Sequence, residues 1–206
     1  LVGSEMCIRD RYLFGFGAEW LFTATFTYFI VFNLEQPRTF VSEMNSLSSI
    51  CQFFSTAFFM MWCAKRGFKR PFIIAILIVV SSVIGYVGVY YLNIPHLTWL
   101  IIGITIWFGL GTGGVYYIPW SVYVFLADVD EVLTGRRREG LYAGAMVMAG
   151  KLMRATVVFC LGVVLSLFGF ESGIHHQSAS AVNAINGVMI SVSYTHLRAH
   201  ETRHDL

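Results

Sequence analysis

The stretch from Pro119 to Lys151, PWSVYVFLADVDEVLTGRRREGLYAGAMVMAGK, decides the fold because a dense cluster of charges separates two apolar runs within it. This order predicts a helix, a polar turn and a second helix. The second apolar run carries two cations, Lys151 and Arg154, among Ala, Val, Met, Gly, Leu and Phe residues. A cation at the centre of a membrane helix costs roughly 2.5–3.5 kcal/mol on the insertion scale, so Lys151 needs a functional reason.

The composition is that of a membrane protein. The 206 residues are 56% hydrophobic and 13% charged, whereas soluble domains carry about 25% charged residues. The net charge of +2 is too small to indicate nucleic acid, and the basic residues lie in short runs between apolar segments, where they set topology. Three cysteines, Cys51, Cys63 and Cys160, lie in apolar runs without metal-ligand spacing, so we expect neither a metal site nor a cofactor.

Six apolar runs predict spanning helices, since about 20 residues cross the hydrocarbon core. Their predicted bounds are Tyr12–Asn33, Met44–Ala64, Pro71–Leu92, Leu97–Leu126, Glu139–Phe168 and, from Gly187 onwards, a sixth helix that is cut short. The fourth run contains GLGTGG (109–114) and Pro119, residues expected where helices approach closely or the backbone bends. The sequence therefore predicts an all-α, polytopic membrane protein.

The two ends differ from the rest of the chain. LVGSEMCIRDR at the start and VSYTHLRAHETRHDL at the end are polar, and the latter follows an apolar run too short to span a membrane. Both closely resemble the translated sequencing adapter that contaminates some environmental assemblies. We expect residues 1–11 and 192–206 to be non-native flanks and residues 12–191 to be the transmembrane unit, with a genuine polar tail as the alternative.

The basic loops predict the orientation in the membrane. KRGFKR (65–70) and GRRREG (135–140) are two spans apart and therefore lie on one side, which the positive-inside bias assigns to the cytoplasm. The opposite loops, 34–43, 93–96 and 171–183, hold one Arg and no Lys. Six spans with both ends in the cytoplasm make one half of a twelve-span transporter, in which two halves enclose a site near the midplane.

The charged stretch resembles a known family. Ala127–Asp128, a second acid at Asp130, TGRRREG (134–140) and a Lys eleven residues after the final Gly are similar to the glycoside–pentoside–hexuronide:cation symporters, the melibiose-carrier branch of the major facilitator superfamily. The chain departs from that pattern, because its two acids are separated by one residue where the family usually has two. The resemblance implies the C-terminal half of a twelve-helix fold: helices 7 to 11 and the start of helix 12.

The resemblance also implies a function, cation-coupled symport of a sugar by alternating access. The helix-11 lysine, here Lys151, lies near the cation site in that family, and a helix-10 aromatic near Trp120 contributes to the sugar site between the halves. The coupling ion would be H⁺ or Na⁺, with its carboxylate ligands in the missing N-terminal half. A lysine that snorkels to the interface is the structural alternative for Lys151.

Further site residues follow from the residue pattern. Arg154 lies on a face next to that of Lys151 and could share the cavity or reach the outer interface. Glu19 is an intramembrane acid and thus a functional candidate, although an interfacial position fits equally well. The charged turn can pair across the two halves and stabilise one access state, or serve topology alone. Its candidate gate residues are Asp128, Asp130, Arg136, Arg137 and Arg138.

Several functions stay open at this point. The leading one is a sugar transporter in a bacterial inner membrane, with membrane lipid, a small solute and the N-terminal half of the same chain as partners. A lysophospholipid or other amphiphile transporter and a non-transporting membrane sensor would keep the same fold. An intramembrane enzyme is disfavoured, since the sequence contains no HExxH or GxSxG motif and no acids in separate spans at metal-ligand spacing.

Overall fold

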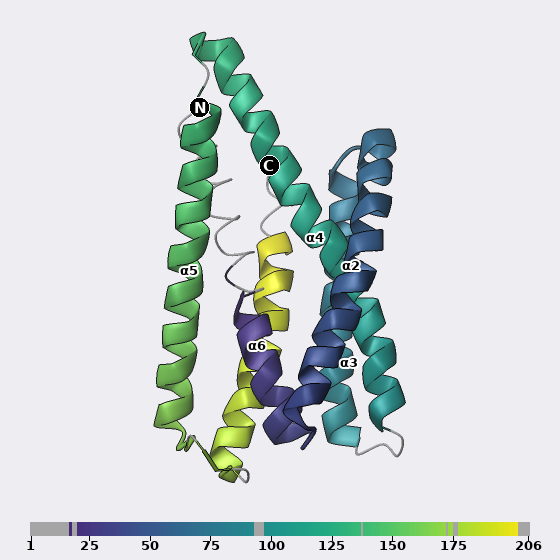
Figure 1. Ribbon diagram of the computed structural model, residues 1–206, viewed down its shortest axis with the longest axis vertical. Helices are drawn as coiled ribbons and strands as arrows, with labels where there is room; N and C mark the ends of the chain where they lie inside the picture. The colour runs from purple at the N-terminus through teal and green to yellow at the C-terminus, as the bar shows by residue number, and fades with distance from the viewer. Residues whose placement is uncertain are drawn as a thin grey trace.

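A computed structural model describes residues 17, 20–92, 97–136, 138–171, 173–174 and 177–201, and it describes no side chain at 97, 122, 123, 125, 126, 133 or beyond 191. Every regular element in these ranges is a helix. A first helix from Trp20 ends in a π-helical turn, and five helices follow it (Figure 1). The elements are η1 (Phe29–Asn33), α2 (Arg38–Arg66), α3 (Lys69–Leu92), α4 (Leu97–Thr134), α5 (Glu139–Leu167) and α6 (Ala179–Glu201).

Four of these helices are long and apolar enough to cross a membrane, which confirms the predicted polytopic, all-α fold. They are Arg38–Arg66, Lys69–Leu92, Thr98–Ser121 and Glu139–Leu167. Two shorter apolar helices, Trp20–Asn33 and Ala179–Ser191, lie between α5 and the group formed by α2, α3 and α4 (Figure 1). Helix α4 leans out of that group and meets the start of α5 at one end of the molecule (Figure 1).

The glycines of GLGTGG let α4 touch two neighbouring helices at once. A Cβ atom added at Gly109 would lie 2.7 Å from the backbone oxygen of Ser48 in α2, and one at Gly111 would lie 2.8 Å from Ile78 in α3. The Ser55 hydroxyl of α2 donates a hydrogen bond to the Leu110 carbonyl across the same contact. The prediction that these glycines mark a close helix approach is therefore confirmed.

An aromatic cluster fixes the first helix against α3 and α4. The Phe22 ring lies 4.6 Å from that of Phe108 and 6.4 Å from that of Tyr86, measured between ring centroids. Tyr86 is fully buried, and its hydroxyl shares a 2.8 Å hydrogen bond with Thr105. Rings in offset or tilted contact stabilise a pair beyond the area that they bury, so this cluster forms the centre of the core.

The π-helical turn is joined to α6 by a buried amide pair. The Nδ2 atom of Asn33 donates to Oδ1 of Asn186 at 2.8 Å and to the Val182 carbonyl at 3.3 Å. Oδ1 of Asn33 and Nδ2 of Asn186 have no hydrogen-bond partner among the described residues. An amide pair in a membrane interior holds two helices in register because each side chain provides a hydrogen-bond partner for the other.

The helix ends differ from the predicted bounds by more than about two residues at three places. Helix α2 begins at Arg38 rather than Met44, directly after Pro37, whose extended backbone (ψ 152°) ends the preceding loop. Helix α4 continues to Thr134 rather than Leu126, and Gly135 (φ +66°) then ends it by donating its N–H to the Glu131 carbonyl at 2.8 Å.

Helix α6 begins at Ala179 rather than Gly187, because the Ser178 hydroxyl accepts the N–H of Ala181 and caps its first turn. The α6 backbone stays helical to Glu201, so it continues past residue 191, where the transmembrane unit was predicted to end. The expected flank at 1–11 lies outside the described residues, as do the side chains of 192–206, so their exclusion from the fold stays a prediction.

Candidate functional site

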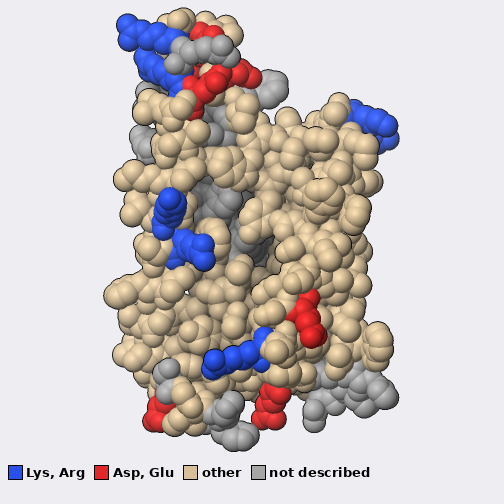
Figure 2. Space-filling model, in the orientation of Figure 1, with Lys and Arg blue, Asp and Glu red and all other residues tan. Residues whose placement is uncertain are grey.

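Lys151 and Arg154 lie about half-way along a helix long enough to span the membrane. Helix α5 has 29 residues, and Lys151 follows its first residue, Glu139, by twelve, about 18 Å at 1.5 Å per residue. Both side chains are exposed. Figure 2 shows Lys and Arg side chains on this face of the molecule well away from its two charged ends. Among the described residues, no carboxylate lies within ion-pair distance of either cation, so neither charge is neutralised by the part of the chain that the structure describes.

Arg154 has an aromatic partner that the sequence did not reveal. Its guanidinium carbon lies 4.4 Å from the ring centroid of Trp20, at the start of the first helix. Next to it, a Cβ atom added at Gly17 would lie 3.3 Å from Met153, so α5 contacts the first segment at two neighbouring positions. No sequence spacing links Trp20 to Arg154, and a chain with 16% aromatic residues offers many equivalent candidates.

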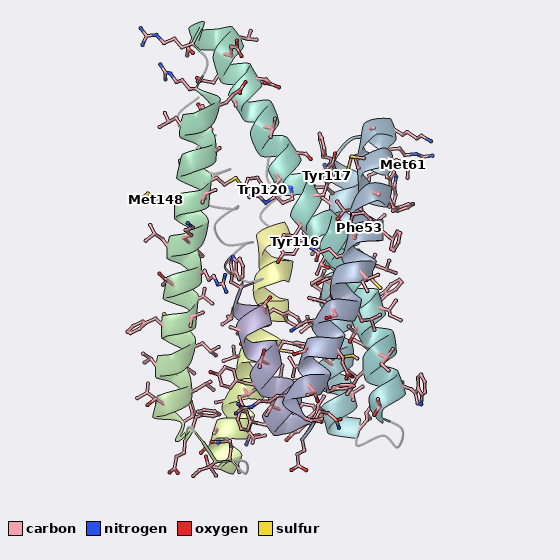
Figure 3. All side chains as sticks on the ribbon, in the orientation of Figure 1. Phe53, Met61, Tyr116, Tyr117, Trp120 and Met148 are labelled. Atoms are coloured by element: carbon pink, nitrogen blue, oxygen red, sulfur yellow. The ribbon has the colours of Figure 1, made fainter. Side chains whose placement is uncertain are left out.

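The side chains on the Lys151 side of α5 are about as exposed as those on its other sides. Val147 and Met148, which lie one turn from Lys151 and so on its side of the helix, are 46% and 64% exposed. Leu152 and Phe159, on other sides of the helix, are 59% and 72% exposed. Met148 points away from the other helices in Figure 3. The only buried α5 side chains among those described are Leu161 and Leu165, in the second half of the helix. All sides of the first half are therefore at least partly exposed.

The α4 helix presents aromatic side chains toward the space beside α5 and α6. Trp120, predicted near the sugar site, is 43% exposed and directly follows Pro119. Tyr116 lies four residues earlier and therefore on the same face. In Figure 3 both project from the side of α4 that faces α5 and α6, and Trp120 lies at the height of Met148. Trp120 is thus within about one helical turn of the level of Lys151.

The predicted gate residues gather where α4 meets α5. Asp128 and Asp130 lie in the last two turns of α4 rather than in a turn, and Arg136 and Arg138 are exposed in the connection to α5. Oδ2 of Asp130 is inaccessible to solvent and accepts no hydrogen bond from a described residue. Two of the predicted site residues, Arg137 and Glu19, lie outside the described residues.

The two basic loops lie at the same end of the molecule, as predicted. The α2–α3 connection and the α4–α5 connection both project at the top of Figure 2, where the Lys and Arg side chains gather. These cations are Lys65, Arg66, Lys69, Arg70, Arg136 and Arg138. Helix α2 begins with Arg38, and this start lies at the opposite end of the molecule (Figure 1). This arrangement is typical of a polytopic protein whose basic end faces the cytoplasm.

The candidate site offers charged and aromatic groups that can bind a solute. Within the ranges that the structure describes, no group of three His, Cys, Asp or Glu side chains could hold a metal ion. The midplane residues are two cations and aromatic rings, which recognise solutes through charge, hydrogen bonds and stacking.

Comparison with known proteins gives the family. The model of the family described as MFS/sugar transport protein matches residues 11–195 of this chain. Over 71 residues, 34% of the chain, the sequence is 38% identical to a protein of Synechocystis sp. named an uncharacterized symporter, and the match covers 13% of that relative's length. Together with its membrane-length helices, this match over most of the chain shows that the protein is a multi-pass membrane protein of the MFS/sugar transport family.

Proposed function

We propose that this chain forms the C-terminal half of a twelve-helix transporter of a bacterial inner membrane, which couples the movement of a sugar to that of H⁺ or Na⁺ by alternating access. One observation carries the proposal: Lys151 lies half-way along a spanning helix, exposed and without a carboxylate partner among the described residues. An uncompensated charge at that depth is costly, and such residues mark ion and substrate pathways.

The coupling follows from competition for the same carboxylates. In a complete transporter, acids of the N-terminal half would neutralise Lys151 when the coupling ion is absent and bind the ion when it arrives. The bound ion would then release the ammonium, so ion occupancy would bias the equilibrium between the two access states. The name of the Synechocystis relative, a symporter, supports this assignment.

The charged end of α4 supports a gate. Asp130 buries an acceptor oxygen that no described residue satisfies, and an unsatisfied buried acceptor costs about 1–3 kcal/mol. An arginine of the opposite half, or Arg137, would supply the missing donor in one access state only. Asp128, Arg136 and Arg138 lie near this acid in the sequence and would form the remaining contacts between the halves.

Transport by Lys151 variants tests the proposal. In the full-length protein reconstituted into proteoliposomes, Lys151→Ala is expected to reduce ion-driven sugar uptake to background while leaving membrane insertion intact. Leu152→Ala is the matched control, since Leu152 is the next residue of the helix and therefore lies on a different face from Lys151. Uptake that survives in Lys151→Ala with unchanged ion dependence would reduce this lysine to an interfacial residue.

A lysophospholipid cargo is the second candidate, favoured by the exposed apolar side chains on the first half of α5. Leu141 is 68% exposed and Leu152 is 59% exposed, so α5 offers apolar surface beside Lys151 for an acyl chain. Flipping of a labelled lysophospholipid in the same proteoliposomes separates the two. Lysophospholipid movement that depends on Lys151, without sugar uptake, would replace the sugar assignment.

A further inference from the structure

We propose that the connection between α2 and α3 binds the headgroup of an anionic phospholipid, with one acyl chain lying along an exposed apolar side of α2. Lipid of every kind surrounds a membrane protein, and this site would select one class of lipid at a defined place. Such a site is independent of the solute that the transporter moves.

The α2–α3 connection carries a concentrated positive charge. Four of its six residues are cations and none is an acid: Lys65, Arg66, Lys69 and Arg70. All four side chains are exposed, and none of them pairs with a carboxylate among the described residues. On the face that Figure 2 shows, this end of the molecule carries Lys and Arg without an Asp or Glu beside them, whereas both signs gather at the α4–α5 connection. Clusters of this size at the end of a membrane helix attract anionic headgroups.

The apolar surface that leads to these cations has the depth of one leaflet. Phe54, Phe58 and Met61 are each more than half exposed. Together with Lys65 they follow the spacing i, i+4, i+7 and i+11, so they lie on one side of α2. Eleven residues rise about 16 Å at 1.5 Å per residue, and half of the hydrocarbon core is about 15 Å. An acyl chain along this side would therefore begin beneath Lys65 and end near the bilayer midplane.

The turn that presents the cations is fixed by the core beneath it. Gly67 (φ +74°) ends α2 and donates its N–H to the Cys63 carbonyl at 2.9 Å. The next residue, Phe68, packs against a buried cluster that contains Phe59, Cys63 and Ile118. The cations therefore lie on both sides of a short, anchored turn, and binding a headgroup costs little ordering of the backbone.

The order of these groups along α2 matches a phospholipid. Apolar side chains at membrane depth are followed by cations at the helix end, as acyl chains are followed by a phosphate. An acid of the N-terminal half could also neutralise the cations, but it would not use the apolar side that leads to them. The charge and the length of the apolar side together favour the lipid.

Lipid titrations of the full-length protein test the site. Native mass spectrometry in detergent at low ionic strength measures the dissociation constants of phosphatidylglycerol and phosphatidylcholine with the same oleoyl chains. The wild type is expected to bind the anionic lipid at least about tenfold more tightly. Equal dissociation constants would overturn the proposal, and they are the result expected if acids of the N-terminal half cover the turn.

Two double variants with the same loss of charge locate the headgroup. Arg66→Gln/Arg70→Gln is expected to weaken phosphatidylglycerol binding about 10- to 30-fold. Arg136→Gln/Arg138→Gln removes two arginines from the other basic connection and should change the binding less than about twofold. Equal losses in the two variants would show that net charge alone attracts the lipid, and the α2–α3 site would be refuted.

Two neighbouring phenylalanines of α2 locate the acyl chain. Phe54→Ser is expected to weaken phosphatidylglycerol binding about 3- to 10-fold by removing apolar contact area. Phe53→Ser is the matched control, because Phe53 is also exposed and, as the preceding residue, lies on a different side of the helix. Glycerophosphoglycerol, the headgroup without acyl chains, should displace the lipid only at a concentration at least about 100-fold higher. Displacement at equal concentration, or equal effects of the two serine variants, would show that the turn binds phosphate alone and would overturn the lipid site.

Discussion

Gly109→Ala adds one methyl group at the tightest contact between α4 and α2. The new Cβ would lie 2.7 Å from both the Ser48 backbone oxygen and the Cys51 Cβ, whereas ordinary contacts lie at 3.4–4 Å. A backbone oxygen cannot rotate away, so α2 must move by several tenths of an ångström. Overpacking of this kind costs about 1–3 kcal/mol. Replacing a helical Gly by Ala returns about 0.5–1 kcal/mol through backbone entropy.

The control lies in the same helix. Gly103 has nothing within 4 Å of its added Cβ, so Gly103→Ala gains the entropy without the clash. The two variants should therefore differ in stability by the overpacking cost alone. Thermal unfolding of the purified full-length protein, followed by tryptophan fluorescence, should give Gly109→Ala a melting temperature about 1–4 °C below that of Gly103→Ala. Equal melting temperatures would show that α2 and α4 are less closely packed than this structure has them.

Three further predictions concern the core and the orientation. Asn186→Leu should lower the unfolding free energy by about 1–3 kcal/mol because it leaves the Asn33 amide unsatisfied, and the double variant with Asn33→Leu should recover part of that loss in the same melting assay. Tyr86→Phe should cost about 0.5–1.5 kcal/mol by removing one buried hydroxyl contact, and a loss of zero would show that the hydrogen bond is not made. In a cysteine-free background, Ile174→Cys should react with an impermeant maleimide applied to intact cells and Arg138→Cys should not, and the reverse pattern would invert the topology.

Several features of the fold could be predicted because they depend on composition over many residues. The apolar runs predicted the spanning helices, and the basic loops predicted which connections share one end. GLGTGG predicted a close helix approach, since only a residue without a side chain allows backbone atoms to come so near. Because these patterns extend over many residues, an error of a few residues in a predicted helix end does not change the prediction.

The remaining features depend on single contacts. The ends of α2, α4 and α6 are set by Pro37, Gly135 and Ser178, and polar residues on either side concealed those boundaries in the sequence. The Trp20–Arg154 contact joins residues 134 positions apart, and local spacing cannot reveal which aromatic ring meets a given cation. The positions of Lys151 and Trp120 along their helices could be predicted. Which side of each helix faces the neighbouring helices could not.

The length of α4 makes its charged end sensitive to small movements of its middle. The helix has 38 residues, about 57 Å at 1.5 Å per residue, and the hydrocarbon core of a bilayer is about 30 Å thick. Pro119 removes one hydrogen bond from the helix ladder, and fifteen residues, about 22 Å, separate it from Thr134. A change in tilt of about 10° at Pro119 therefore displaces the end of the helix by about 4 Å. A displacement of that size is enough to break or form an ion pair. A bend beside Trp120 would therefore form or break charge contacts at the membrane surface.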